Sequence, residues 1–316
     1  MRGAAIGAVF ALASLASATA GADVTLLLCE PYGRLARFSP TGHIAVYLDR
    51  VCADTPTVLR RCEPGETGVV ISRYKQVAGA DWLAVPLIPY LYAVSQAVEV
   101  PASADRQQVA ALRNAYREAH LRDLVPDGPG GQPPNGNWFQ LVGAAYDRRI
   151  VAFTVKTTAE QDDDVIRTLN ERPNRSRFST VFRNCADFAR DVIDLYYPKA
   201  LKNNLIADLG LTTPKQVAKS LVQYTNRQPE LPLSAFVVPQ IPGSRGQSGA
   251  TRGVLESLVK KAMYLVPLAL VQPWIPTACA AGYLVAGRFD PRRHSAGEYS
   301  PADLEAWAKG VAAPGE

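Results

Sequence analysis

A cysteine stands where a polar loop is predicted to enter an amphipathic helix. Cys185 follows Asn184, a preferred helix-capping residue, so the cysteine is expected in the first helical turn. Apolar residues recur downstream at helical spacing and make one face: Phe188, Ala189, Val192, Ile193 and Tyr196. Free backbone N–H groups and the positive end of the helix dipole at this place favour thiolate over thiol. The pattern predicts a nucleophilic cysteine.

A thiol nucleophile needs a base, commonly a histidine within hydrogen-bond reach. The chain has three histidines. His43 opens a predicted strand after a glycine-containing turn and shares a strand face with the small Ala45, which leaves room for the ring. His120 lies on the buried face of a predicted helix, and His294 lies in a polar tail. We therefore expect His43 to be the base.

Composition is that of an ordinary globular protein: 316 residues, 47% hydrophobic and 20% charged. The net charge of +5 comes without a Lys/Arg run or a basic stripe with interleaved aromatics, which argues against nucleic-acid binding. Cys52 and Cys62 could be half a zinc site, but no second cysteine or histidine pair has ligand spacing, and no phosphate-binding loop follows a predicted strand. We expect neither a metal nor an organic cofactor.

The N-terminus has the pattern of an export signal. Arg2 is followed by an uncharged apolar run from Gly3 to Ala18, and small residues then offer cleavage after Ala20 or Ala22. Residues 1–22 are therefore predicted to be a signal peptide. The mature protein is expected in the periplasm or cell envelope, where disulfides persist.

Cysteine parity bears on which thiol stays free. The chain has five cysteines, and an odd count in an exported protein leaves at least one unpaired. Cys52 and Cys62 flank a short proline-containing loop and are the natural disulfide pair. Cys29 and Cys279 could pair only if the fold brings the two ends of the chain together. Cys185 would then be free by elimination.

The element pattern predicts an α+β fold. Expected strands cover 23–28, 43–48, 69–74, 138–146 and 150–156. Expected helices cover 105–121, 158–170 and 185–197, and another starts at Thr213. Because 43–48 and 69–74 are neighbouring strands in sequence, we expect them to pair as antiparallel partners. Strand alternation separates His43, Ala45 and Tyr47 from Ile44, Val46 and Leu48.

The C-terminal third changes in composition. Residues 228–253 are rich in Pro, Gly and Ser and are predicted to be a linker between a catalytic domain, 23–227, and a C-terminal segment, 254–316. The stretch Ala262–Gly287 has no charged residue and exceeds the roughly 20 residues that span a bilayer. Its three prolines count against a regular helix. Two readings stay open: a membrane-embedded, transmembrane segment or a proline-rich packed hairpin.

The order of the two motifs resembles a known group. A strand that begins Gly42-His43, followed far downstream by Asn184-Cys185-x-x-Phe188 at a helix start, is similar to the circularly permuted papain-like superfamily. This group includes permuted NlpC-type cell-wall peptidases and relatives of lecithin:retinol acyltransferase. In papain the cysteine helix comes first; in permuted members the histidine comes first, as here. The resemblance covers roughly residues 33–197 and implies an antiparallel sheet packed on the helix that bears the nucleophile.

The resemblance also implies residues that support the Cys185 and His43 pair. A third polar residue should orient the histidine, and two candidates remain open: Ser72 within the following strand and Glu66 just before it. The backbone N–H of the cysteine would contribute to an oxyanion hole. Asn184 or Tyr47 could add a side-chain donor.

These observations lead to an expected function with one rival. The leading expectation is an exported cysteine hydrolase, a peptidase or amidase, or an acyltransferase, acting on an amide or ester. Its location makes a peptidoglycan peptide or an acyl-lipid the expected substrate. The rival is a non-catalytic binding or scaffold protein of the same fold, associated with the membrane through Ala262–Gly287.

Overall fold

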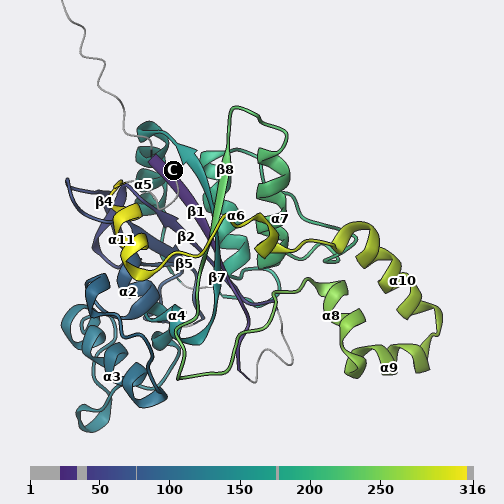
Figure 1. Ribbon diagram of the computed structural model, residues 1–316, viewed down its shortest axis with the longest axis horizontal. Helices are drawn as coiled ribbons and strands as arrows, with labels where there is room; N and C mark the ends of the chain where they lie inside the picture. Colours follow the sequence, from purple (N-terminus) through teal and green to yellow (C-terminus); the bar gives the residue numbers. More distant parts are fainter. Residues whose placement is uncertain (1–21, 34–40, 76, 176–177, 312–316) are drawn as a thin grey trace, which may run out of the picture.

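The computed structural model describes residues 22–311 except 34–40, 76 and 176–177. Its centre is an antiparallel sheet of six strands in the order β6-β5-β2-β1-β7-β8 (Figure 1). These strands are β1 (Ala22–Cys29), β2 (His43–Leu48), β5 (Val69–Ser72), β6 (Leu83–Pro86), β7 (Ile150–Thr157) and β8 (Leu233–Val238). A separate hairpin is formed by β3 (Val51–Thr55) and β4 (Val58–Arg61). The α+β class is thus confirmed, and so is the antiparallel pairing of β2 with β5.

Helices cover both faces of the sheet, so the protein has two hydrophobic cores. One face is covered by α5 (Ala159–Glu171), α6 (Cys185–Tyr196) and α7 (Pro214–Thr225). The other is covered by α2 (Leu87–Tyr92), α3 (Arg106–Tyr116), α4 (Ala144–Asp147) and α11 (Pro301–Ala308). In β2, Ala45 and Tyr47 belong to the α2–α4 core, and Ile44, Val46 and Leu48 belong to the α6 core, as alternation predicts.

Shorter segments connect these elements. Four of those within the described residues are 3₁₀-helices: η1 (Ala97–Glu99), η3 (Pro129–Gly131), η4 (Trp138–Leu141) and η6 (Pro291–His294). Two more in that part of the chain are short π-helices: η2 (Arg117–Leu121) and η5 (Tyr283–Gly287). An arm that projects from the body consists of α8 (Val254–Lys260), α9 (Ala262–Val271) and α10 (Trp274–Gly282) (Figure 1).

Side-chain caps start the helices where the sequence predicts. Asn184 accepts hydrogen bonds from the backbone N–H groups of Ala186 and Asp187 and so begins α6 at Cys185. Thr158 forms a capping box at the start of α5, and Thr213 caps α7 with proline at the first position. The cysteine therefore lies in the first turn of a capped helix, as expected.

The expected strand at 138–146 is wrong. This stretch forms η4 and α4 instead, with Gly143 in the left-handed region at φ +74° between them. The guanidinium of Arg113, on α3, donates to the carbonyl oxygens of Val142 and Gly143 at 3.0 Å each and pairs with Asp147 at 2.7 Å. These bonds use backbone groups that a strand would need for its ladder.

The predicted linker, 228–253, contains an integral strand. β8 pairs with β7 from Leu233 to Val238 and forms an edge of the central sheet. Farther on, Leu304 and Ala308 of α11 are buried in the core on the α2 side. The proline- and glycine-rich residues around β8 hide this strand in the composition. The sheet and its covering therefore extend beyond residue 227.

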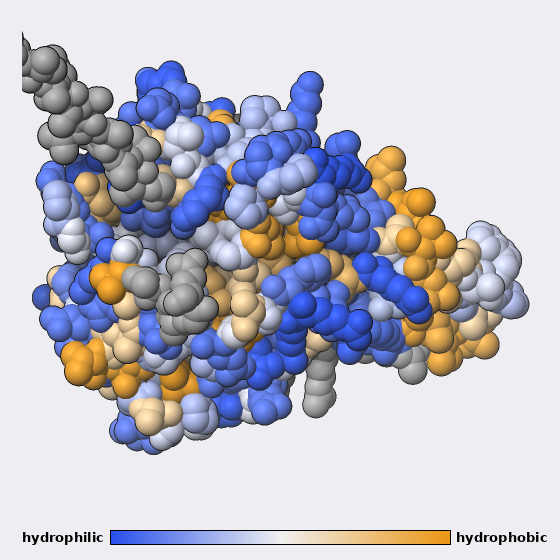
Figure 2. Space-filling view, turned by 45° about the horizontal axis from the view of Figure 1, so that its top comes forward, coloured by the Kyte–Doolittle hydropathy of each residue, from blue (hydrophilic) through white to orange (hydrophobic). Residues whose placement is uncertain are grey.

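The apolar stretch Ala262–Gly287 does not form one long helix. It is divided into α9 and α10 by a break at Gln272 and Pro273, and Pro267 lies inside α9. Across the described residues, none of the helices has the length and apolar character required to cross a membrane. Figure 2 shows apolar side chains gathered over the arm.

Candidate active site

A cavity of about 660 Å³ opens where β2 and α6 begin, and both Cys185 and His43 line it. The chain enters β2 through Gly42, which has a positive φ of +74°. A Cβ at this position would lie 2.3 Å from the carbonyl oxygen of Cys29, so the close approach to β1 requires glycine. The turn delivers His43 to the edge of the cavity.

Ser72 holds the imidazole ring of His43. The Ser72 hydroxyl donates to the carbonyl oxygen of Ile44 at 2.9 Å, and its oxygen lies 3.1 Å from Nε2 of His43. A hydroxyl has one proton, so the Ser72 oxygen must accept from an Nε2–H group. This assigns the proton to Nε2 and leaves Nδ1 as the basic nitrogen. Of the two candidates for the orienting residue, Ser72 is the one that contacts His43.

The surroundings of His43 disfavour its charged form. The ring stacks on Tyr74 with 5.5 Å between centroids. Burial, and then the positive charge of Arg148, lower the pKa of His43 from 6.5 to about 3. The imidazole is therefore neutral at neutral pH and able to accept a proton.

The thiol of Cys185 is also neutral at rest. Burial raises its pKa from 9.0 to about 11, although the backbone N–H of Ile44 and its own N–H act in the opposite direction. The sequence predicts a thiolate from the helix start alone; here the loss of hydration outweighs that contribution. The resting pair is a thiol and a neutral imidazole, and sulfur would lose its proton only as it reacts.

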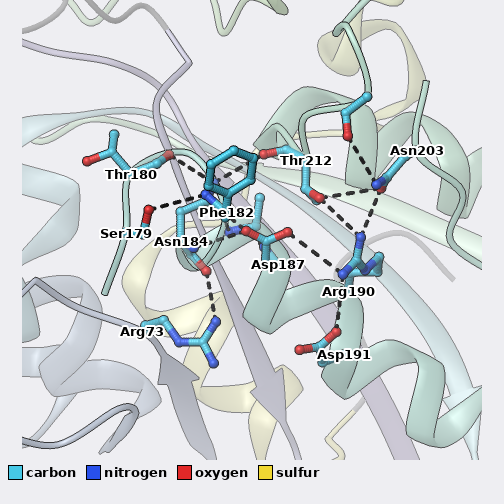
Figure 3. A network of polar contacts seen from close by, with 12 residues as sticks. Arg73, Ser179, Thr180, Phe182, Asn184, Asp187, Arg190, Asp191, Asn203 and Thr212 are labelled. Carbon is cyan, nitrogen blue, oxygen red and sulfur yellow. Dashed lines mark hydrogen bonds and ion pairs between the residues drawn. The ribbon is translucent and has the colours of Figure 1, made fainter. Parts of the chain in front are cut away.

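A polar network fixes the start of α6 relative to β5 (Figure 3). The guanidinium of Arg73, just after β5, donates to the carbonyl oxygen of Asn184 at 3.3 Å and pairs through two bonds of 2.8 Å with Asp81. The side-chain amide of Asn184 donates to the carbonyl oxygens of Thr180 and Thr212. Both amide hydrogens are thus used, so Asn184 acts as a helix cap and structural support.

Two other candidates lie elsewhere. Glu66 pairs with Arg60 through bonds of 2.7 and 2.8 Å near the β3–β4 hairpin and does not line the cavity. Tyr47 is buried in β2, with its ring 5.3 Å from that of Trp307. Its hydroxyl has no hydrogen-bond partner among the described residues, and it too lies outside the lining. Neither Glu66 nor Tyr47 therefore lies where it could support Cys185 or His43.

The structure contains one disulfide among its described cysteines, and the suggested pair Cys29–Cys279 does not form. Cys52 and Cys62 form the predicted disulfide, with an S–S distance of 2.09 Å. Cys29, Cys185 and Cys279 are all free. Cys29, the last residue of β1, is buried with its sulfur 3.4 Å from the hydroxyl of Tyr90, and Cys279 lies on α10. The free state of Cys185 therefore does not depend on a second disulfide.

The described residues offer one cluster with metal-ligating atom types: Cys52, Cys62 and Glu66, within 4.8 Å of one another. The two sulfurs are bonded to each other, and the carboxylate is engaged by Arg60. The cluster is therefore better described as a disulfide beside an ion pair.

Arg148 is the main residue of the cavity that sequence reasoning missed. It lies just before β7, in what looks in the sequence like a hairpin turn, yet its guanidinium lines the cavity. Tyr74 and the N–H group of Ile44 were also not anticipated. No local pattern marks these residues, because the fold brings them together from separate strands.

Comparison with known proteins gives no match: no family model, curated protein or solved structure is significantly similar to this chain. What the site can do must therefore be argued from its own geometry.

Proposed function

We propose that this protein is a cysteine hydrolase or acyltransferase of the permuted papain-like type. Cys185 attacks the carbonyl carbon of an amide or ester, and His43 accepts the thiol proton. The observation that carries this proposal is the shared cavity: a thiol in the first turn of a capped helix and a neutral imidazole, oriented by Ser72, line the same space.

The chemistry follows from the neutral resting pair. Nδ1 of His43 takes the proton as the sulfur bonds to the carbonyl carbon, which forms a tetrahedral oxyanion. The backbone N–H of Cys185 lies in the first turn of α6, where it is suited to donate to that oxygen. When the intermediate collapses, His43 returns the proton to the leaving amine or alcohol. The remaining thioester is then released by water or by an acceptor amine.

The substrate and location are part of the same proposal. The disulfide between Cys52 and Cys62 suits an oxidising compartment and so supports export to the periplasm or cell envelope. The predicted signal peptide lies outside the described residues except for Ala22, the first residue of β1. A peptidoglycan peptide or an acyl-lipid is the substrate class that this location favours.

Turnover of p-nitrophenyl acetate tests the proposal. The wild-type protein should release p-nitrophenol catalytically, and Cys185→Ala should abolish this release. Cys279→Ala is the matched control, because Cys279 is another partly exposed free thiol, and it should retain full turnover. Equal rates in the wild-type and Cys185→Ala proteins would contradict an acyl-enzyme on Cys185.

The alternative is a non-catalytic protein attached to a membrane surface, which the arm favours. Several apolar side chains of α9 and α10 are largely exposed: Val266 (57%), Leu270 (82%), Val271 (73%) and Trp274 (65%). Flotation with anionic phospholipid vesicles should recover the wild-type protein and not Leu270→Glu/Trp274→Glu. Attachment without turnover by Cys185 would support this alternative; absence of flotation would contradict it.

A further inference from the structure

The cavity beside Cys185 is lined by positive charge. Arg73, Lys75, Arg148 and Arg245 line it, and the described lining contains no Asp or Glu. Arg73 is paired with Asp81, and Arg245 with Asp147. Within the described part of the chain, no carboxylate pairs with Arg148 in this way.

Arg148 is a buried cation that makes no ion pair with an acidic side chain among the described residues. Arg148 is 8% exposed, and its Nε has no hydrogen-bond partner among the residues described. One face of its guanidinium lies on the ring of Tyr32, 4.3 Å from the centroid. The neighbouring Asp147 is already shared by Arg113 and Arg245. Burying a charge is costly unless it is paired, so an anion bound beside Arg148 would be stabilising.

We propose that Arg148 binds an oxyanion of the substrate, a carboxylate or a phosphate, beside the scissile bond presented to Cys185. The inference rests on the proposed function and adds the substrate class to it. A guanidinium offers two parallel N–H donors in a fixed plane, which matches the two oxygens of a carboxylate or phosphate. The aromatic ring of Tyr32 holds that plane in place.

Anion binding to Arg148 would also raise the pKa of His43. The positive charge of Arg148 is one cause of the low pKa of His43. An anion on Arg148 offsets that charge and makes the imidazole a stronger base. His43 would thus become more basic when an anionic substrate is bound, whereas a neutral compound would leave its basicity unchanged.

Calorimetric binding to the Cys185→Ala protein tests the anion site without any need for catalysis. The probes are succinate, inorganic phosphate and the neutral succinamide. Succinate or phosphate should bind, and succinamide should not; the stronger of the two anions identifies the group. Arg148→Gln should weaken binding about 10- to 100-fold, the value of a lost charged hydrogen bond. Arg149→Gln removes the same charge outside the lining and should leave binding unchanged.

The outcomes separate the two proposals. Lack of binding by both anions, equal binding of succinamide, or anion binding unaffected by Arg148→Gln would overturn the anion site. Anion binding that depends on Arg148, in a protein whose Cys185 fails to turn over p-nitrophenyl acetate, would contradict the proposed function and leave the anion site standing. If Arg148→Gln does not fold, Arg148→Lys keeps the charge and loses the planar fork, and it should bind more weakly than wild type.

Discussion

The hydroxyl oxygen of Ser72 lies 3.1 Å from Nε2 of His43 while its proton points to the carbonyl oxygen of Ile44. This arrangement fixes both the plane of the ring and its tautomer. Serine is uncharged, so it orients the imidazole without stabilising the imidazolium ion as a carboxylate would. The low pKa of His43 is consistent with that difference.

Replacing Ser72 should lower kcat, because its hydroxyl orients the imidazole of His43. In Ser72→Ala, the ring loses one hydrogen bond and can adopt the other tautomer, so kcat for p-nitrophenyl acetate should fall about tenfold with KM unchanged. Ser72→Thr keeps the hydroxyl and should restore most of the rate. Unchanged kcat in Ser72→Ala would remove Ser72 from the positioning of His43.

The pH profile of kcat/KM should have an unusually acidic lower limb. His43 works as a base only when neutral, and with a pKa of about 3 it stays neutral until the pH falls well below 6.5. Arg148→Gln removes one cause of this low pKa, so the acid limb should move to higher pH; Arg149→Gln should not move it. A wild-type limb at the usual histidine value would contradict the buried site described above.

The buried ion pair behind the site should be costly to break. Asp81 is 5% exposed and binds both Arg73 and Arg183. Asp81→Asn leaves two cations without a counter-charge and should lower the free energy of unfolding by about 3 kcal/mol, measured by urea denaturation. Asp54→Asn, in an exposed ion pair, should cost much less. Equal losses would show that the buried pair has no special weight.

Asp49 gives a dependence of stability on pH. Burial is the main reason that its pKa rises from 3.8 to about 7. Between these values the folded protein holds the proton more tightly than the unfolded chain, so stability falls as the pH rises from about 4 to about 7 and is constant above that range.

Asp49→Asn removes that penalty. Relative to wild type, the variant should gain about 4 kcal/mol at about pH 8 and almost nothing at about pH 4, which thermal unfolding at the two pH values can measure. The exposed Asp123→Asn serves as the charge control and should show no such difference. An equal effect of Asp49→Asn at both pH values would be inconsistent with a raised pKa.

Local signals in the sequence predicted the parts of the site that local structure determines. Asn184 caps α6 because its side chain reaches two nearby N–H groups, a relationship contained in four residues. The alternating faces of β2 and the disulfide between Cys52 and Cys62 are of the same kind. The pairing of β2 with β5 followed from sequence proximity.

Relationships across distant segments could not be predicted in this way. Arg148 enters the cavity only because β7 lies beside β1, and β8 is recognisable as a strand only through its pairing with β7. The protonation state of Cys185 was also missed, since the helix start can be predicted from sequence and the degree of burial cannot. Each of these features depends on packing that no single segment encodes.

The most direct test of the central claim is the mass of the protein shortly after mixing with p-nitrophenyl acetate at neutral pH. We predict one acetyl group, mapped to Cys185 by peptide mass spectrometry. It should be absent in Cys185→Ala and should form about 100-fold or more slowly in His43→Ala, the usual contribution of a general base. Acetylation spread over other residues, or formed at the same rate without His43, would contradict a Cys185 nucleophile activated by His43.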